Sequence, residues 1–194
     1  MERILSGAYA PGDRLVELQI AQELGTSQGP VREALRDLQG LGLVESESYR
    51  GTRVRQITER EIEEAYQVRS VLEQLAAELA APKLQGNTRE LEREVAAFSQ
   101  AAREKDIKTY SAHDMDFHRI IVEAAGNELL STMWNSVVLE SRFRFTLMHR
   151  IGADELENLA AAHVPITEAL HAGDATRAGM LARDIICTFH SRKN

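Results

Sequence analysis

The chain has 194 residues, a net charge of −7, 43% hydrophobic and 27% charged residues, and one cysteine. This length allows one large domain or two smaller ones, and the composition is typical of an ordinary soluble globular protein. We expect no membrane span, because no apolar run approaches the ~20 residues that a span requires. With a single cysteine and no signal-peptide pattern, the expected location is cytoplasmic.

The negative charge is distributed unevenly along the chain. Residues 1–57 hold seven basic and eight acidic residues, a net charge of −1, whereas residues 58–194 carry a net charge of −6. A protein that reads DNA needs positive charge at the contact rather than a basic average. The acidic total therefore does not exclude a nucleic-acid partner for the N-terminal segment.

The N-terminal segment shows the pattern of a helix-turn-helix. Apolar spacing over Val16–Leu24 predicts a short helix, which Gly25 ends. Ser27 is suited to cap a second helix, and Pro30 falls in its first turn, where a missing N–H costs little. The buried stripe expected for this second helix is formed by Val31, Leu35 and Leu38.

Two short strands are expected after the second helix, over Leu43–Glu45 and Thr52–Val54. The polar segment between them ends in Gly51 and suits a turn, so the pair forms a hairpin of the kind called a wing. Arg32 and Arg36 lie four residues apart on one helix face. Such a face can contact the major groove of DNA. The alternative is a solvated face whose arginines pair with Glu33 and Asp37.

From Thr58 onward the sequence contains only helical patterns. Thr58 with Glu61, and Asn87 with Glu90, have the spacing of capping boxes. The first helix should stop by Pro82, and Pro165 should kink or split a later one. The six expected helices begin near Thr58, Asn87, Asp106, Glu128, Ala153 and Gly173. They predict a helical bundle of ~135 residues, large enough to form its own core.

The order of many short motifs resembles the GntR family of bacterial transcription regulators, in the FadR-like branch with a C-terminal FCD effector domain. The N-terminal motifs are Ile4–Gly7, Pro11–Leu15, Leu24–Ser27, Pro30–Leu35, Leu38, Gly42–Val44 and Arg50–Val54. The C-terminal motifs are Val68-Arg69, Leu72-Glu73, Asp114–His118, Ala124–Asn127, His163 and Gly173-Asp174. The resemblance implies a mainly α fold, with a winged helix-turn-helix over residues 1–57. An all-helical, FCD-like domain for effector binding and dimerisation follows over residues 58–194.

Two features depart from the family pattern. Only Met1-Glu2-Arg3 precede the Ile4 position, so either the first helix is a stub or the start of the chain is truncated. The family commonly has arginine after the serine that opens the second helix, where this chain has Gln28. Because glutamine pairs with adenine rather than guanine, the operator should differ from the usual one.

The resemblance implies DNA contacts from the second helix and from the wing. The residues expected to contact bases or phosphates are Ser27, Gln28, Arg32, Arg36, Arg50 and Gly51. We expect a ligand-responsive regulator, a repressor that binds a palindromic double-stranded operator as a homodimer. No enzymatic activity is expected.

Three C-terminal residues have the chemistry of a metal site. Asp114 and His118 lie four apart on one helix face, and His163 adds a second imidazole. One carboxylate and two imidazoles suit a divalent transition metal such as zinc, nickel or manganese. The resemblance implies a third histidine near residues 184–185, where this chain has Asp184 and Ile185. Asp184 could therefore supply a carboxylate in place of that imidazole.

In the family, the cavity beside this metal binds a small molecule, often an organic acid. A metal with open positions can take a carboxylate directly. Arg142 and Arg144 could also face the cavity, but they are two apart and only one of them can do so, so Arg142 is our candidate. Two rival functions remain open from the sequence. One is a helical metal-dependent hydrolase, and the other is a winged-helix module for protein contacts with a structural metal.

Overall fold

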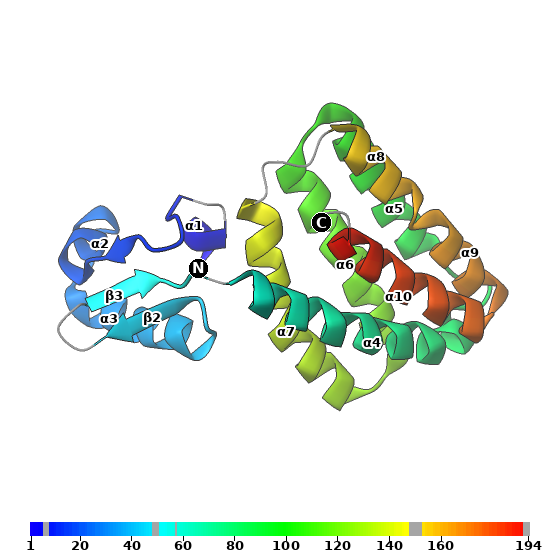
Figure 1. The fold of residues 1–194 in the computed structure, drawn as a ribbon, viewed down its shortest axis with the longest axis horizontal. Helices are drawn as coiled ribbons and strands as arrows, with labels where there is room; N and C mark the ends of the chain where they lie inside the picture. Colours follow the sequence, from blue (N-terminus) through cyan, green and yellow to red (C-terminus); the bar gives the residue numbers. More distant parts are fainter. Residues whose placement is uncertain (6–7, 48–50, 57, 148–152, 192–194) are drawn as a thin grey trace. The chain divides into compact units, whose positions relative to one another are not determined.

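The computed structural model describes residues 1–5, 8–47, 51–56, 58–147 and 153–191. It forms two compact units, residues 1–62 and residues 63–194, whose elements are labelled in Figure 1. Within the described ranges, no helix combines the length and the apolar character that a membrane crossing demands.

The first unit is a winged helix-turn-helix. Its elements are α1 (Glu2–Leu5), β1 (Arg14–Leu15), α2 (Glu17–Glu23), α3 (Gln28–Gly40), β2 (Val44–Glu47) and β3 (Gly51–Val54). The strands form an antiparallel sheet in the order β1-β3-β2, with Arg14 opposite Arg53 and Val44 opposite Val54. The two predicted strands are confirmed. The third, β1, was not predicted, because two residues are too few to show the alternation of a strand.

The core of the first unit lies between the sheet and the two longer helices. Val31 and Leu35 bury the inner face of α3, as predicted, whereas Leu38, the third residue of the expected stripe, is half-buried. Val54 of β3 is fully buried. An apolar pocket of about 420 Å³ remains beside α2 and α3, with Ile4 of α1 among its walls. The apolar stripe thus fixes which face of α3 is turned outward.

The second unit is an all-helical bundle. Its helices are α4 (Glu59–Leu84), α5 (Arg89–Glu104), α6 (Ile107–Ala125), α7 (Glu128–Leu147), α8 (Ala153–Ala161), α9 (Val164–Ala172) and α10 (Ala175–Ser191). Helix α5 packs against α6 on one side and against α8 and α9 on another, while α10 lies along α9 (Figure 1). α4 starts before residue 63 and continues into this unit.

Several helix ends follow the predicted signals. Thr58 and Glu61 form the expected capping box: the Thr58 N–H donates to Glu61 Oε2 at 2.8 Å, and the Glu61 N–H donates to Thr58 Oγ1 at 3.2 Å. Asn127 accepts from the Leu130 N–H at 3.1 Å. Gly126 ends α6 with φ of 63°, a left-handed conformation that favours glycine. Local capping chemistry therefore determined these boundaries.

Two predicted boundaries were wrong, and a third prediction is confirmed. Helix α4 does not stop by Pro82 but includes it and ends two residues later, at Leu84. The proline removes only its own N–H from the hydrogen bonds of the last turn, so the helix can include it before it ends. The box of Asn87 with Glu90 does not form, since Thr88 is the capping position and its hydroxyl bonds Glu92. The predicted break near Pro165 is confirmed, because the helix splits there into α8 and α9. The proline occupies the first turn of α9, where its missing N–H is not needed.

Candidate functional site

Helix α3 presents the residues predicted to contact DNA. Ser27 is its N-cap residue with extended backbone, and Gln28 is its first residue. Both are exposed, as are Arg32 and Arg36 on the face opposite to the buried stripe. This arrangement turns a polar, arginine-bearing surface outward.

Arg32 is held by an acidic residue of the preceding helix. Its Nε lies 3.0 and 3.1 Å from the two carboxylate oxygens of Glu17, and its Nη2 lies 2.7 Å from Glu17 Oε2. The hydrogen bonds from Arg32 lower the pKa of Glu17. The alternative considered from the sequence named Glu33 and Asp37 as partners of the arginines. Neither pairs with Arg32, because residues one and five positions away do not share its helix face.

The wing places one further arginine at its edge. Gly51 has φ of 80°, and a Cβ added there would lie 3.5 Å from Arg14 Nε. Arg53 donates to the Gly12 carbonyl at 3.3 Å, and Arg55 pairs with Glu61. Arg14, on the unpredicted strand β1, is therefore an additional candidate for contact with a phosphate. Arg50 lies outside the described residues.

The structure brings the three predicted metal ligands together inside the bundle. Asp114 and His118 project from one face of α6, and His163 is the N-cap residue at the break between α8 and α9. His163 Nε2 lies 3.3 Å from Asp114 Oδ1 and 3.4 Å from His118 Nε2. One ligand atom from each residue lies within 4.8 Å of the others. Both imidazoles are buried.

Two buried aromatic rings pack against His163 of this cluster. The rings of Phe98 and Phe117 lie 4.8 and 5.0 Å from the His163 ring, measured between centroids. Burial alone would raise the pKa of Asp114, but the hydrogen bond from His163 and the positive potential of His118 lower it. Asp114 is therefore an ionised ligand at neutral pH.

A carboxylate that we did not predict as part of the site orients His118. Glu73 of α4 is 3% exposed, and its Oε2 lies 2.5 Å from His118 Nδ1. Its Oε1 accepts from Arg69 Nε at 2.6 Å and from Trp134 Nε1 at 2.9 Å. Burial would raise the pKa of Glu73, but the charge of Arg69 and the bond from His118 bring it below its usual range. Histidines that bind a metal commonly donate their other ring N–H to a carboxylate in this way.

The hydrogen bonds of the two imidazoles show that the cluster fits a cation. Because Glu73 is ionised and can only accept, His118 Nδ1 carries the proton. His163 Nδ1 lies 2.8 Å from the Leu159 carbonyl oxygen, which also only accepts. A metal ion would take the place of the Nε2 proton with which His163 bonds Asp114, and each ring would then present its Nε2 electron pair to the ion. The two Nε2 atoms and one Asp114 carboxylate oxygen lie within 4.8 Å of one another, so a single divalent cation could bind all three.

A second group of potential ligands has different chemistry. Glu94, His113 and Asp116 lie partly exposed on α5 and α6, with ligand atoms within 4.8 Å of one another. His113 Nδ1 bonds Glu94 Oε2 at 2.7 Å, and Asp116 pairs with Arg119. These charges already have partners, so this group does not call for a cation.

One buried cation next to the metal ligands lacks a full set of partners. Among the described residues, Arg69 Nη2 is the buried side-chain atom without a hydrogen bond, although Arg69 is only 5% exposed. Arg69 Nε donates to Glu73 Oε1 at 2.6 Å, and Glu73 bonds the metal ligand His118, so a single side chain separates Arg69 from the cluster. A buried N–H without an acceptor costs free energy, and a ligand anion would relieve that cost.

The other predicted site residues do not join this cluster in the described part of the chain. Asp184 is exposed on α10, while its neighbours Ile185 and Ile186 are buried. Arg142 falls within α7, but its side chain is not among those that the structure describes. The described cluster therefore has three candidate ligands. Glu73 bonds one of them, His118, and Arg69 bonds Glu73.

Comparison with known proteins agrees with this division into two units. The family model of "Bacterial regulatory proteins, gntR family" matches residues 1–54, and that of the "FCD domain" matches residues 64–187. The chain belongs to the GntR family, in the FadR-like branch with an FCD domain. It is a transcription regulator of a DNA-binding family and not an enzyme, which removes the hydrolase alternative.

Several curated regulators are similar to this GntR protein. A probable D-xylose utilization operon transcriptional repressor of Paenarthrobacter nicotinovorans is 40% identical over 172 residues, covering 88% of this chain and 75% of that one. The gluconate operon transcriptional repressor of Bacillus subtilis is 30% identical over 152 residues, covering 77% of this chain and 62% of that one.

Solved structures confirm the fold. McbR/YncC of Escherichia coli superposes with a TM-score of 0.85 at 23% identity, covering 96% of this chain and 89% of that one. A putative GntR regulator from Rhodococcus has a TM-score of 0.83 at 25% identity, with 98% and 91% covered. The predicted mainly α architecture, a winged helix-turn-helix followed by an FCD bundle, is thus confirmed.

Proposed function

We propose that this GntR regulator is a repressor of an operon for sugar or organic-acid utilisation, released or recruited by a carboxylate effector. The observation that carries the proposal is the buried cluster of Asp114, His118 and His163 beside the unpartnered Arg69 nitrogen. The cluster would hold a cation, and the Arg69 nitrogen would bind an anion beside it. Similar proteins are named as repressors of D-xylose and gluconate operons, which supports this class of target.

The operator contact is assigned to the outward face of α3 and to the wing. Ser27 and Gln28 stand at the start of α3, where helix-turn-helix proteins meet base edges. Arg32 and Arg36 extend the same face, and Arg14 beside Gly51 adds charge at the wing. Selection from randomised duplex DNA tests this proposal. Enrichment of a short palindrome is expected, and enrichment of no sequence would contradict it.

Replacing Arg32 by alanine should weaken binding to the selected operator by about 1–3 kcal/mol, because a guanidinium contact to a base or phosphate is lost. Fluorescence anisotropy at fixed salt measures the change. Glu17→Gln is the matched control, since it breaks the same ion pair but keeps the guanidinium. If both variants bind equally weakly, Arg32 acts only through the ion pair and the assigned DNA contact is wrong.

A homodimer is part of the proposal, because each half of a palindromic operator is bound by one winged helix-turn-helix. Helix α4 carries exposed apolar side chains spaced three and four apart, each between 37% and 55% exposed. They are Val68, Val71, Leu75 and Leu79. A continuous apolar stripe of this kind suits burial against a second copy of the chain.

The metal proposed for the FCD domain is a divalent transition ion held by Asp114, His118 and His163. When bound, such an ion supplies a Lewis-acid position that a ligand carboxylate can occupy. Glu73 holds His118 in the tautomer that turns Nε2 toward the ion. Arg69 offers its Nη2 group to an anion arriving beside them. We assign this role to Arg69 in addition to the sequence-based candidate Arg142.

Substituting Arg69 by lysine should weaken the binding of D-gluconate or citrate at least about tenfold, because one charge-assisted hydrogen bond is lost. Lysine keeps a positive charge beside Glu73, so the fold should survive. Isothermal titration of zinc-loaded protein measures the affinity, and zinc content provides the control. Unchanged affinity for every carboxylate that binds the wild type would contradict the assignment.

Helix α4 is our candidate for the route between effector and operator. It runs without interruption from Glu59 to Leu84 and carries both Arg69 and Glu73. By linkage, the effector and the operator must change each other's affinity by the same factor. We therefore infer that the segment from Ile57, which lies outside the described residues, to Arg69 transmits the change.

A further inference from the structure

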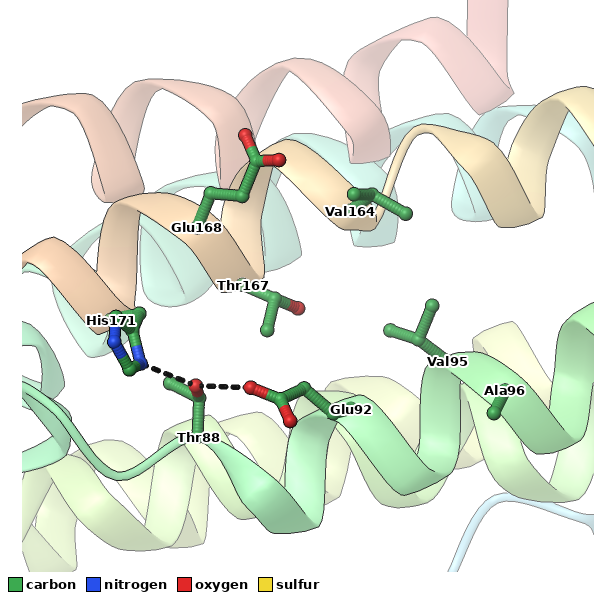
Figure 2. A pocket seen from close by; sticks show the side chains of 8 residues that line it. All are labelled: Thr88, Glu92, Val95, Ala96, Val164, Thr167, Glu168 and His171. Atoms are coloured by element: carbon green, nitrogen blue, oxygen red, sulfur yellow. Dashed lines mark hydrogen bonds between the residues drawn. The ribbon is translucent and has the colours of Figure 1, made fainter.

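A second pocket lies in the helical unit, between α5 and α9, and none of the three metal ligands lines it. Its volume is about 440 Å³, within the range of small-molecule sites. Figure 2 shows its lining side chains, four before or on α5 and four on α9. They are Thr88, Glu92, Val95, Ala96, Val164, Thr167, Glu168 and His171.

The pocket exists because short side chains face each other where the two helices pass. Val95 and Ala96 of α5 oppose Val164 and Thr167 of α9, and none of these is long enough to fill the space (Figure 2). The floor is therefore mostly apolar, with methyl and methylene groups toward the space. An apolar floor with a few polar groups is the usual composition of a binding site.

The polar groups at one end are already oriented. Thr88 Oγ1 donates to Glu92 Oε1 at 2.8 Å and lies 3.0 Å from His171 Nδ1 (Figure 2). Since the single hydroxyl proton goes to Glu92, His171 Nδ1 must be the donor in the second bond. This chain fixes one oxygen of Glu92, and Glu92 Oε2 has no hydrogen bond to any described residue.

The charge of the lining selects one class of ligand. It contains two carboxylates, Glu92 and Glu168, and among the described residues no lysine or arginine contributes to it. Both carboxylates are exposed and can be solvated by water, but an anion would meet repulsion there. A positive ammonium group would gain charge-assisted hydrogen bonds while its carbon skeleton lies on the apolar floor.

We propose that the pocket between α5 and α9 is a second ligand site, separate from the carboxylate effector site, which takes a small organic ammonium cation. Glu92 is its principal anchor, and Glu168 on the opposite helix adds a second negative charge to the lining. The site adjoins the metal cluster, because α9 begins directly after His163 and the Thr167 hydroxyl donates to the His163 carbonyl at 3.2 Å. A bound cation thus contacts the helix that carries a metal ligand.

Titration with 2-phenylethylamine tests the proposal, with 2-phenylethanol and 3-phenylpropionate as probes of similar shape and different charge. The full chain is used, and ligand-observed NMR with isothermal titration measures affinity. The amine should bind at least about tenfold more tightly than the alcohol, since one charged hydrogen bond distinguishes them. Equal affinity for amine and alcohol, or no binding of the amine, would overturn the proposal.

Variants locate the binding. Glu92→Gln combined with Glu168→Gln keeps the shape of the pocket and should weaken amine binding at least about tenfold, whereas Ala96→Phe fills the space and should abolish it. Glu90→Gln is the matched control on α5, because Glu90 is exposed and does not line the pocket. Zinc content and thermal unfolding report that each variant is folded. Amine binding that survives Ala96→Phe would show that it occurs elsewhere, and the proposal would be wrong.

Discussion

Replacing Glu73 by alanine should lower the free energy of unfolding by about 3–5 kcal/mol. Glu73 is the shared acceptor for Arg69, His118 and Trp134, all of them buried. Without it, the Arg69 charge is left buried and uncompensated, and two further N–H donors lose their acceptor. Urea denaturation followed by circular dichroism measures the change.

The control for this variant is Glu90→Ala on α5. Glu90 pairs with Arg93 at 3.6 Å, and both side chains are more than two-thirds exposed, so the pair should contribute less than about 1 kcal/mol. Both variants remove one carboxylate from a helix, but only one removes a buried acceptor. If Glu73→Ala costs no more than Glu90→Ala, the buried network does not stabilise the bundle as argued.

The parts of the fold that depend on neighbouring residues were predictable from the sequence. The helix-turn-helix, the wing and the capping box at Thr58 rest on side chains within a few positions of one another. Strand β1 was missed because its two residues pair with β3, some 38 positions later. The register Arg14–Arg53 is a property of the folded sheet and leaves no local pattern.

Interactions across elements explain what sequence reasoning missed at the sites. The partner of Arg32 was sought among nearby acids, but Glu17 lies on the preceding helix, 15 positions away. Trp134 meets Glu73 across 61 positions. The motif Leu72-Glu73 was noticed only as a family resemblance, since nothing in its spacing reveals a bond to His118.

The prediction of Asp184 as a fourth metal ligand depended on which face of α10 each residue occupies. Asp184, Ile185 and Ile186 are consecutive on α10, and each residue is turned about 100° from the one before. A shift of one position therefore decides whether a carboxylate or an isoleucine faces the core. The structure turns the two isoleucines inward and leaves Asp184 exposed. In contrast, the four-residue spacing of Asp114 and His118 fixes their common face without any such uncertainty.

Substituting His163 by alanine should abolish stable metal binding. Its Nε2 is the atom that lies near both Asp114 and His118, and without it only two ligands on α6 remain. Protein purified without chelator and analysed for metals should contain about one ion per chain, and the variant should contain almost none. Zinc, nickel or manganese at 100 times its dissociation constant should stabilise the wild type by about 2.7 kcal/mol and leave the variant unchanged.

His113→Ala is the matched control, because His113 adjoins Asp114 on the same helix but bonds Glu94 instead. It should keep its metal. A wild-type protein without metal, to which none of the three ions can be restored, would refute the metal proposal.

Glu73, which bonds the metal ligand His118, allows a more specific test of the metal proposal. In Glu73→Gln, the side-chain amide can donate to His118 Nδ1, so the ring proton moves to Nε2 and blocks the electron pair that faces the ion. Metal affinity should fall about 10–100-fold, although all three ligands are still present. A Glu73→Gln variant that binds zinc as tightly as the wild type would show that the tautomer of His118 does not depend on Glu73.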